Sequence, residues 1–265
     1  MSGQPPATGT PTTPAGLGVR VLGCAGGYPA AGSPCSGYLL QAAEQQVWID
    51  AGGGTLAELQ RHCQVADLDA VWISHLHPDH CTDLPLLVWL LLLGGAQRAT
   101  PLPVLGPVGW AATVADFIDE PLAEVEKVVE IVELRDGQQA RFGDLAVTAV
   151  ATAHGIPTYG LRASLGSRTV AYTADSGPCA ALGQLAQGSD LLVCEAGTAT
   201  PRPIHLTAEQ AGPACRRQRR EQVGAHPPAP QRRPGPACSL AAAAFGGHVE
   251  AAAPGRRLEL LPPAP

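Results

Sequence analysis

Four side chains that commonly bind metal ions lie close together shortly after residue 70. The segment Ile73-Ser74-His75-Leu76-His77-Pro78-Asp79-His80 contains all of them: His75, His77, Asp79 and His80. Imidazole and carboxylate ligands suit zinc, manganese or iron(II), and a cluster this dense can serve two ions rather than one. The sequence therefore predicts a metal centre in this loop.

The apolar run that precedes the cluster predicts how it is held. Residues 69–73 read as a buried strand that leads directly into the loop. Alternate residues of an extended chain point the same way, so His75, His77 and Asp79 are expected to converge. By the same alternation, His80 is expected to point the other way.

Five further motifs follow apolar segments along the chain. They are Val47-Trp48-Ile49-Asp50-Ala51-Gly52-Gly53-Gly54, Ala153-His154-Gly155, Tyr172-Thr173-Ala174-Asp175-Ser176-Gly177, Cys194-Glu195-Ala196-Gly197 and Ile204-His205-Leu206-Thr207. With the histidine cluster, they resemble in content and order the motifs of the metallo-β-lactamase superfamily, over Val19 to Gly212. The last two resemble signatures of its ribonuclease Z and phosphodiesterase branch.

The resemblance implies a fold and a set of ligands. The fold would be of the α/β class, a four-layer αβ/βα sandwich of two sheets between helices, and strands alternating with helices along the chain agree with it. The ligands would hold two divalent ions, with zinc as the first choice and manganese or iron as alternatives: His75, His77 and His154 on the first ion, Asp79 and His80 on the second, and Asp175 bridging both.

The resemblance also implies a mechanism. Two ions about 3.5–4 Å apart turn a shared water into a hydroxide nucleophile near neutral pH, which Asp79 would orient. His205 would donate a proton to the leaving oxygen, and Glu195 would hold its ring. The resemblance therefore implies a metallo-hydrolase, and specifically a phosphoric diester hydrolase.

Structural readings of these residues stay open beside the functional ones. His205 could be a surface histidine before a helix, because Thr207 to Gln210 form a capping sequence. Glu195 ends an apolar strand, where a structural ion pair would also explain a carboxylate. Asp50 is better explained as a hydrogen-bond partner of a ligand histidine than as a ligand.

Composition limits the class of protein. The chain has 265 residues and a net charge of −6, which fits one domain and disfavours tight binding to long nucleic acids. Its eight cysteines are scattered, which suits a reduced, cytoplasmic protein. Residues 1–17 resemble a disordered leader rather than a signal peptide, and residues 18–265 a single hydrolase domain.

Two apolar or flexible segments have more than one interpretation. Leu84 to Leu93 is too short to span a membrane and is expected to be a buried helix, although a homodimer face would also explain it. The glycine-rich turn from Gly23 to Pro29 lacks dinucleotide-binding spacing. It is either a plain turn or a close backbone approach to substrate.

The spacing between His154 and Asp175 bears on the substrate. Ribonuclease Z enzymes of the bacterial type carry a long arm at this place, and the segment here holds only two short strands and a turn. A small phosphodiester, such as a cyclic nucleotide, is therefore the preferred substrate. The alternatives are a transfer RNA 3′-processing endonuclease without the arm, and a metal-binding chain with impaired catalysis.

The chain departs from the family pattern after Gly212. The expected fifth motif, a strand ending in Leu-Thr-His that supplies the second ion's remaining histidine, is missing, and residues 213–238 are rich in Arg and Pro. No core strand is expected there. A disturbed reading frame would explain the segment and predicts weak binding of the second ion; alternatively, His226 or His248 replaces the missing ligand.

Overall fold

The computed structural model describes residues 16–42, 44–215, 223–226, 234–246 and 248–260. Most of the expected leader lies outside these residues. Leu17, which was assigned to the leader, instead begins the first strand and is buried.

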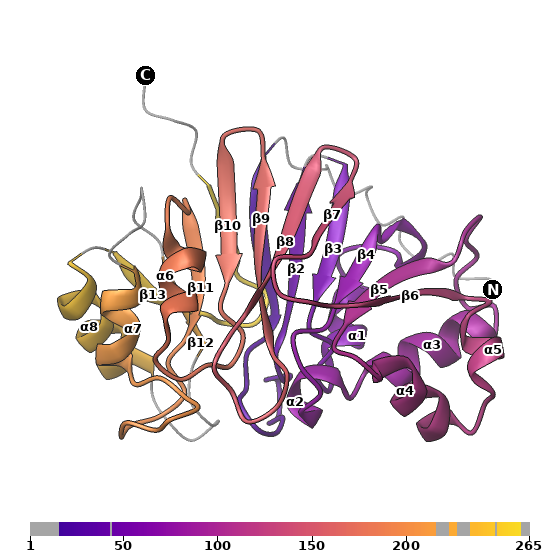
Figure 1. Ribbon diagram of the computed structural model, residues 1–265, viewed down its shortest axis with the longest axis horizontal. Coiled ribbons are helices and arrows are strands. Elements are labelled where there is room, and N and C mark those ends of the chain that lie inside the picture. Colours follow the sequence, from indigo (N-terminus) through magenta and orange to yellow (C-terminus); the bar gives the residue numbers. More distant parts are fainter. Residues whose placement is uncertain (1–15, 43, 216–222, 227–233, 247, 261–265) are drawn as a thin grey trace, which may run out of the picture.

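Two seven-stranded sheets lie face to face, with helices on both outer sides (Figure 1). The first sheet contains, in spatial order, β14 (Arg257–Glu259), β1 (Leu17–Gly23), β2 (Gly37–Ala42), β3 (Gln45–Ile49), β4 (Ala70–Trp72), β5 (Leu102–Gly106) and β6 (Val129–Glu133). The second contains β13 (Val249–Ala251), β12 (Val223–His226), β11 (Leu191–Glu195), β10 (Arg168–Tyr172), β9 (Tyr159–Leu165), β8 (Leu145–Ala151) and β7 (Gln139–Phe142). The expected four-layer sandwich is confirmed.

The helices divide between the two outer layers. Those on the side of the first sheet are α1 (Thr55–Leu59), α2 (Pro78–Cys81), α3 (Leu84–Leu92), α4 (Trp110–Ile118) and α5 (Leu122–Val125), together with a 3₁₀ turn at Val65–Asp67. Those on the side of the second sheet are α6 (Ala180–Ala186), α7 (Ala208–Cys215) and α8 (Pro234–Phe245).

Successive side chains of a strand point to opposite faces of its sheet. Each sheet therefore packs against the central core on one face and against helices on the other. In β3, Val47 and Ile49 face the core between the sheets, whereas Trp48 packs toward the helices of the first layer. In β11, Val193 faces the central core and Leu192 faces α6 and α7. Side chains two apart share a face of a strand, so a continuous apolar run is what a doubly covered strand requires.

Both sheets contain parallel strands whose carboxyl ends carry the polar motifs. Strands β3 to β6 are parallel to one another, and so are β10 to β13. Asp50 follows β3, the histidine loop follows β4, Asp175 follows β10 and Glu195 ends β11. Loops at one end of two facing sheets therefore bring together residues far apart in the sequence.

Most expected elements are present, and the differences are local. The turns at Gly143-Asp144 and Gly166-Ser167 join antiparallel pairs of strands. The helix expected over Leu84 to Leu93 is α3, and a separate short helix, α2, precedes it. Strands β6 and β7 and helices α5 and α6 were not predicted, because their mixed apolar and polar residues give no clear period.

The anomalous segment contributes a strand, so the expectation that no core strand forms there is wrong. Val223–His226 forms β12, which pairs in parallel with β11 on one side and β13 on the other. Four residues with two neighbouring strands need only backbone hydrogen bonds to join a sheet, and no long apolar run. Residues 216–222 and 227–233 lie outside the described residues.

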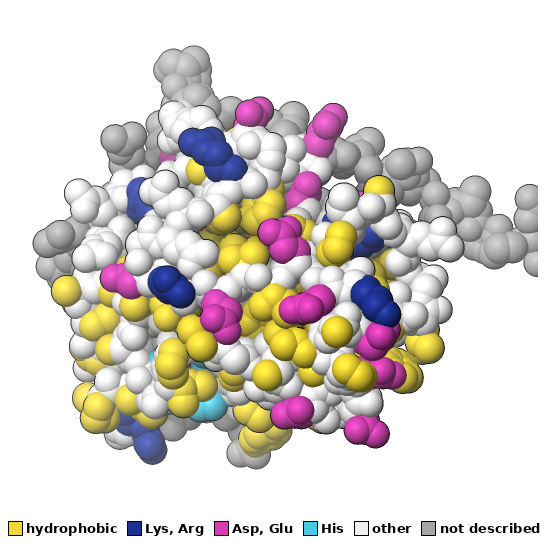
Figure 2. Space-filling view, turned by 45° about the vertical axis from the view of Figure 1, so that its right-hand side comes forward, with side chains coloured by type: hydrophobic (Ala, Val, Ile, Leu, Met, Phe, Trp, Pro, Cys, Tyr) yellow, Lys and Arg dark blue, Asp and Glu magenta, His cyan; other side chains and the backbone are white. Residues whose placement is uncertain are grey.

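Helix α3 is both a buried helix and a surface element. Leu84, Leu87, Val88 and Leu91 are buried, whereas Leu86, Trp89 and Leu93 are exposed. Figure 2 shows a face on which hydrophobic side chains lie among acidic groups. Of the helices that the structure describes, none combines the length and apolar character needed to cross a bilayer.

Candidate metal centre

The histidine loop changes from extended backbone to a helix within a few residues. His77 is extended and serves as the N-cap of α2, and Pro78 is the first helical residue, where its missing N–H costs nothing. Asp79 and His80 therefore lie on a helical turn rather than on an extended chain. The expected outward orientation of His80 is wrong, because this turn rotates its ring back toward His75, at 4.1 Å between ring centroids.

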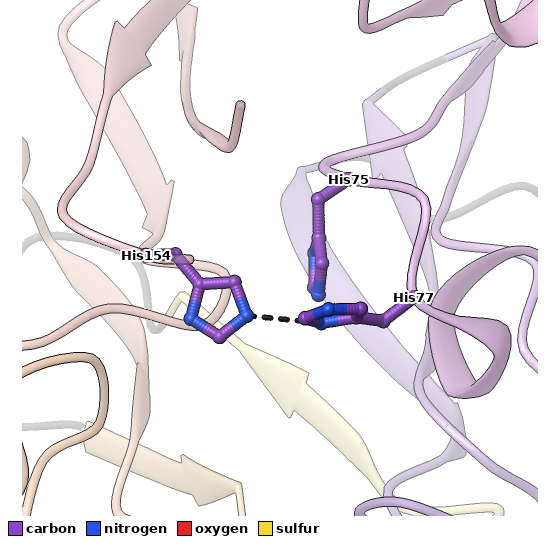
Figure 3. Close-up of side chains that lie close together, drawn as sticks. All are labelled: His75, His77 and His154. Atoms are coloured by element: carbon purple, nitrogen blue, oxygen red, sulfur yellow. Dashed lines mark hydrogen bonds between the residues drawn. The ribbon is translucent and has the colours of Figure 1, made fainter. Parts of the chain in front are cut away.

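Three histidines from two sheets form the first group of candidate ligands. His75 and His77 come from the loop after β4, and His154 comes from the loop after β8 (Figure 3). His154 Nε2 lies 3.0 Å from His77 Nδ1, and both rings are 4.9 Å from that of His75. The Nε2 atom of His75 is buried and has no hydrogen-bond partner, which fits a metal ligand rather than a core histidine.

Asp175 lies between these three histidines and a second group of candidate ligands, which contains His80 and Asp79. Its Oδ1 is 3.4 Å from His80 Nε2, and its Oδ2 is 4.0 Å from His75 Nε2. Asp79 Oδ2 is 3.6 Å from His80 Nε2. One carboxylate thus presents an oxygen to each group, which is the arrangement that a bridging ligand requires.

Backbone and carboxylate acceptors orient two of the rings. His154 Nδ1 donates to the carbonyl oxygen of Ile204 at 3.0 Å, and His80 Nδ1 donates to Asp50 Oδ2 at 2.7 Å. In each ring Nε2 is then the nitrogen left for a metal. Asp50 therefore partners a candidate ligand, as its position in the sequence suggested.

Asp50 is wholly buried and receives four hydrogen bonds. Its Oδ1 accepts from the backbone N–H of Ser74 at 2.8 Å, and its Oδ2 accepts from the hydroxyl groups of Ser74 and Tyr172 at 2.9 and 2.6 Å, besides His80. Its φ of 55° is rare for a residue other than glycine. Such a backbone is retained only when surrounding contacts require it.

Glu195 and His205 form a pair beside Asp175. His205 Nδ1 donates to Glu195 Oε1 at 2.6 Å, and it lies 3.8 Å from Asp175 Oδ2. Glu195 Oε2 accepts the backbone N–H of Ser176 at 2.6 Å. The buried Glu195 thus has a partner, and that partner is the histidine proposed for acid catalysis.

The capping sequence after His205 also forms. The backbone N–H of Thr207 donates to Gln210 Oε1 at 3.0 Å, and that of Gln210 donates to Thr207 Oγ1 at 3.3 Å. This reciprocal pair begins α7 and holds the loop that carries His205. The structural reading of the motif and its place beside the ligands are therefore compatible.

Burial and neighbouring charges shift the pKa values of the histidines and of Glu195 in different directions. Burial lowers the pKa of His75 well below its ordinary value, whereas Asp175 and Asp50 outweigh burial at His80 and raise its pKa. The hydrogen bond to Glu195 raises the pKa of His205. Burial raises the pKa of Glu195 to about 7.

Two glycines allow the backbone to approach the metal loop. Gly27, in the glycine-rich turn, has a positive φ and donates its N–H to Asp79 Oδ2 at 2.6 Å. A Cβ at Gly52 would overlap the backbone oxygens of Asp79 and Ser36. The glycine-rich turn therefore contacts a candidate ligand.

We expect Gly52→Ala to displace the metal loop. Overpacking at a site enclosed by backbone should lower the free energy of unfolding by about 1–3 kcal/mol and reduce bound zinc. Gly53→Ala is the matched control, because no atom lies within 4 Å of its added Cβ. Thermal unfolding and zinc content measure both effects, and equal behaviour of the two variants would contradict the close approach.

Sequence reasoning assigned no role to three of the residues around the ligands. Tyr172 was only part of a motif, Ser74 was only a position in the loop, and Gly27 was only part of a turn. Their roles depend on contacts across the fold, at sequence separations of 122, 24 and 52 residues. No local pattern signals such contacts. The thiol of Cys81, directly after the metal loop, donates to His77 O, and burial raises its pKa to about 11.

Comparisons with known proteins agree with this geometry. The family model described as a beta-lactamase superfamily domain matches residues 45–225. An uncharacterized protein of Mycobacterium leprae is 34% identical over 92% of this chain and 89% of its own length. The probable metallo-hydrolase YhfI of Bacillus subtilis is 30% identical over 67% of this chain and 71% of its own length.

Solved structures share the fold over most of the chain. The metallo-beta-lactamase fold protein YhfI from Bacillus subtilis has a TM-score of 0.80 and 26% identity, covering 92% of this chain and 98% of that one. Human tRNase Z, short form, has a TM-score of 0.70 and 21% identity over 92% and 99% of the two chains. A diphosphatase of the PhnP family has a TM-score of 0.65 and 19% identity over 92% and 97%.

The matched family model covers more than half of the chain and includes the histidine loop, His154, Asp175 and Glu195. The ligand groups lie at the loops where the two sheets meet, and the fold is shared with YhfI across nearly the whole of both chains. The chain belongs to the metallo-β-lactamase superfamily and is a metallo-hydrolase related to ribonuclease Z.

Proposed function

We propose that the protein is a phosphodiesterase that acts on a small phosphodiester with two divalent ions, zinc being the first candidate. The proposed ligands are His75, His77 and His154 on one ion, Asp79 and His80 on the other, and Asp175 between them. Histidine and carboxylate donors in these numbers suit zinc, with manganese or iron as alternatives. When bound, the ions supply an activated water nucleophile and neutralise charge on the phosphoryl group.

The pair of His205 and Glu195 is the observation that carries the proposal. His205 Nδ1 is held by Glu195 at 2.6 Å, so Nε2 is the nitrogen that can donate a proton to a leaving oxygen. The ring stands 5.1 Å from that of His154, at the edge of the ligand groups. An acid in this place suits a phosphate ester, whose leaving alkoxide needs a proton.

The short connection between His154 and Asp175 supports a small substrate. Residues Tyr159–Leu165 and Arg168–Tyr172 pair as β9 and β10, with only Gly166 and Ser167 between them. This tight hairpin leaves no long arm to clamp a transfer RNA at this place. The likeness to human tRNase Z keeps a transfer RNA endonuclease as the second candidate.

The strand β12 supports His226 as the remaining ligand of the second ion. In the parallel pairing of β11 with β12, His226 lies opposite Glu195, at the carboxyl edge that carries Asp175. His248 precedes β13, which is parallel to β12, and therefore lies at the amino ends of these strands. There its Nε2 is 3.5 Å from Glu250 Oε2. The topology thus supports His226 rather than His248 as the proposed ligand.

We expect His226→Ala to lose one of two bound zinc ions and His248→Ala to keep both. The two variants remove the same side chain from opposite edges of one sheet, so each controls for the other. Metal analysis of the purified proteins measures the outcome. One tightly bound ion in the unaltered protein would instead support a disturbed segment at 213–238 and an impaired enzyme.

A panel of substrates tests the proposed activity. The protein, loaded with zinc or with manganese, is assayed on a generic phosphodiester, on cyclic nucleotides and on a transfer RNA precursor. Hydrolysis of the small esters without cleavage of the precursor supports the proposal. Cleavage of the precursor alone would establish the endonuclease, and no hydrolysis by metal-loaded protein would establish the impaired member.

A further inference from the structure

We propose that Tyr172 is a positioning residue for the second metal ion, acting through Asp50 on His80. Its hydroxyl donates to Asp50 Oδ2 at 2.6 Å, and the same oxygen accepts from His80 Nδ1 at 2.7 Å. The inference rests on the proposed function, because it assigns His80 to a bound ion. It adds a residue that lies one hydrogen bond further from the metal.

The contact joins the two halves of the molecule. Tyr172 ends β10 in the second sheet, whereas Asp50 and His80 belong to loops of the first sheet. Asp175 lies only three residues beyond Tyr172, so the strand that presents the bridging carboxylate also supports the histidine on the other side. The hydroxyl therefore sets the position of one ligand with reference to another.

The Tyr172 hydroxyl stabilises the Asp50 carboxylate, in addition to the packing of the Tyr172 ring in the core. Asp50 is wholly buried, and a buried carboxylate with too few donors is strongly destabilised. Removing the Tyr172 hydroxyl leaves Oδ2 with the hydroxyl of Ser74 and the ring of His80. The carboxylate then keeps three of its four hydrogen bonds, so Oδ2 and the His80 ring bonded to it are held less firmly.

The effect should be larger on the second ion than on the first. His80 bonds Asp50 directly, whereas His75 reaches it only through Ser74, whose Oγ lies 3.0 Å from His75 Nδ1. Hydrogen-bond partners of ligand histidines typically contribute about 10–100-fold to metal affinity. We expect about a 10-fold loss at the second ion, and a smaller loss at the first.

The test compares Tyr172→Phe with Tyr38→Phe. Tyr38 is an equally buried tyrosine whose ring centroid lies 5.3 Å from that of Tyr172, and its hydroxyl bonds Ser36. It therefore reaches Tyr172 only through the longer contact of 3.4 Å between Ser36 Oγ and the Tyr172 hydroxyl, and it makes no hydrogen bond to Asp50. Zinc affinities are measured by chelator competition, and unfolding of the metal-free proteins gives the purely structural cost of each change. Tyr172→Phe should weaken the second ion about 10-fold and Tyr38→Phe should leave both ions unchanged.

A double variant distinguishes action through Asp50 from a separate effect. If Tyr172 acts through the carboxylate, Asp50→Asn with Tyr172→Phe should bind the second ion no more weakly than Asp50→Asn alone. Two ions held with unaltered affinity by Tyr172→Phe, or weakened equally, would overturn the role and leave the proposed function standing. No second ion in the unaltered protein would overturn both.

Discussion

Asp175→Ala is expected to abolish hydrolysis and to lose bound metal together, and His75→Ala is expected to do the same. Asp175 presents one oxygen toward His80 and the other toward His75, at 3.4 and 4.0 Å. His75 is wholly buried, and its Nε2 has no other partner. Removing the Asp175 carboxylate or the His75 imidazole takes away a ligand that lies inside the protein. Solvent-exposed side chains cannot reach this position to replace it.

Metal content, measured beside the rate of hydrolysis, shows whether the two losses coincide. Asp116→Ala is the control for the carboxylate, since Asp116 is exposed on α4. His62→Ala is the control for the imidazole, since His62 bonds Glu58 away from the centre. Full metal content in Asp175→Ala, or hydrolysis retained by His75→Ala, would contradict the assignment of these ligands.

The sequence predicted the members of the site better than their arrangement. His75, His77 and Asp79 lie within five residues of the chain, so a dense local motif was enough to predict a metal loop, and the structure brings His75 and His77 together with His154. Their directions depend on where the strand ends and the helix begins. Pro78 begins α2, which turned His80 toward the centre although simple alternation pointed it away.

Contacts between distant segments could not be read from local patterns. The hydrogen bond from Tyr172 to Asp50 joins residues 122 positions apart, and it exists only because β10 packs opposite the loop after β3. The short strand β12 has the same origin: its pairing with β11 and β13 comes from the sheet and not from its four residues. Periodicity describes one element at a time, whereas these features belong to pairs of elements.

The fold itself was predictable because its strands are covered on both faces. Continuous apolar runs such as Val47 to Ile49 and Leu191 to Cys194 indicate strands buried between layers. Turns of glycine and a polar residue indicate the hairpins that join antiparallel neighbours. Strands β6 and β7 lie at the outer edges of their sheets and carry exposed side chains, so the same reasoning did not find them.

His205→Ala should slow hydrolysis by about 10²-fold or more and leave bound metal nearly unchanged. His205 is bonded to Glu195 at 2.6 Å and stands 3.8 Å from Asp175. It also lies close enough to His154 and Asp175 to share an ion with them, so the experiment decides between an acid and a ligand. Rates and metal content are measured on the same preparation. A His205→Ala variant that loses metal as thoroughly as His75→Ala would show that His205 is a ligand.

Substrates with different leaving groups show whether His205 donates a proton or whether its removal disturbs the whole site. A nitrophenyl ester departs without a proton, so its hydrolysis should suffer less from His205→Ala than that of an ester with an alkoxide leaving group. Glu195→Gln should show the same preference with a smaller loss, because the ring keeps a hydrogen-bonding neighbour but loses the carboxylate that holds it. Equal losses for both esters would remove acid catalysis as the role of His205, since a residue that donates no proton in the transition state cannot distinguish a good leaving group from a poor one.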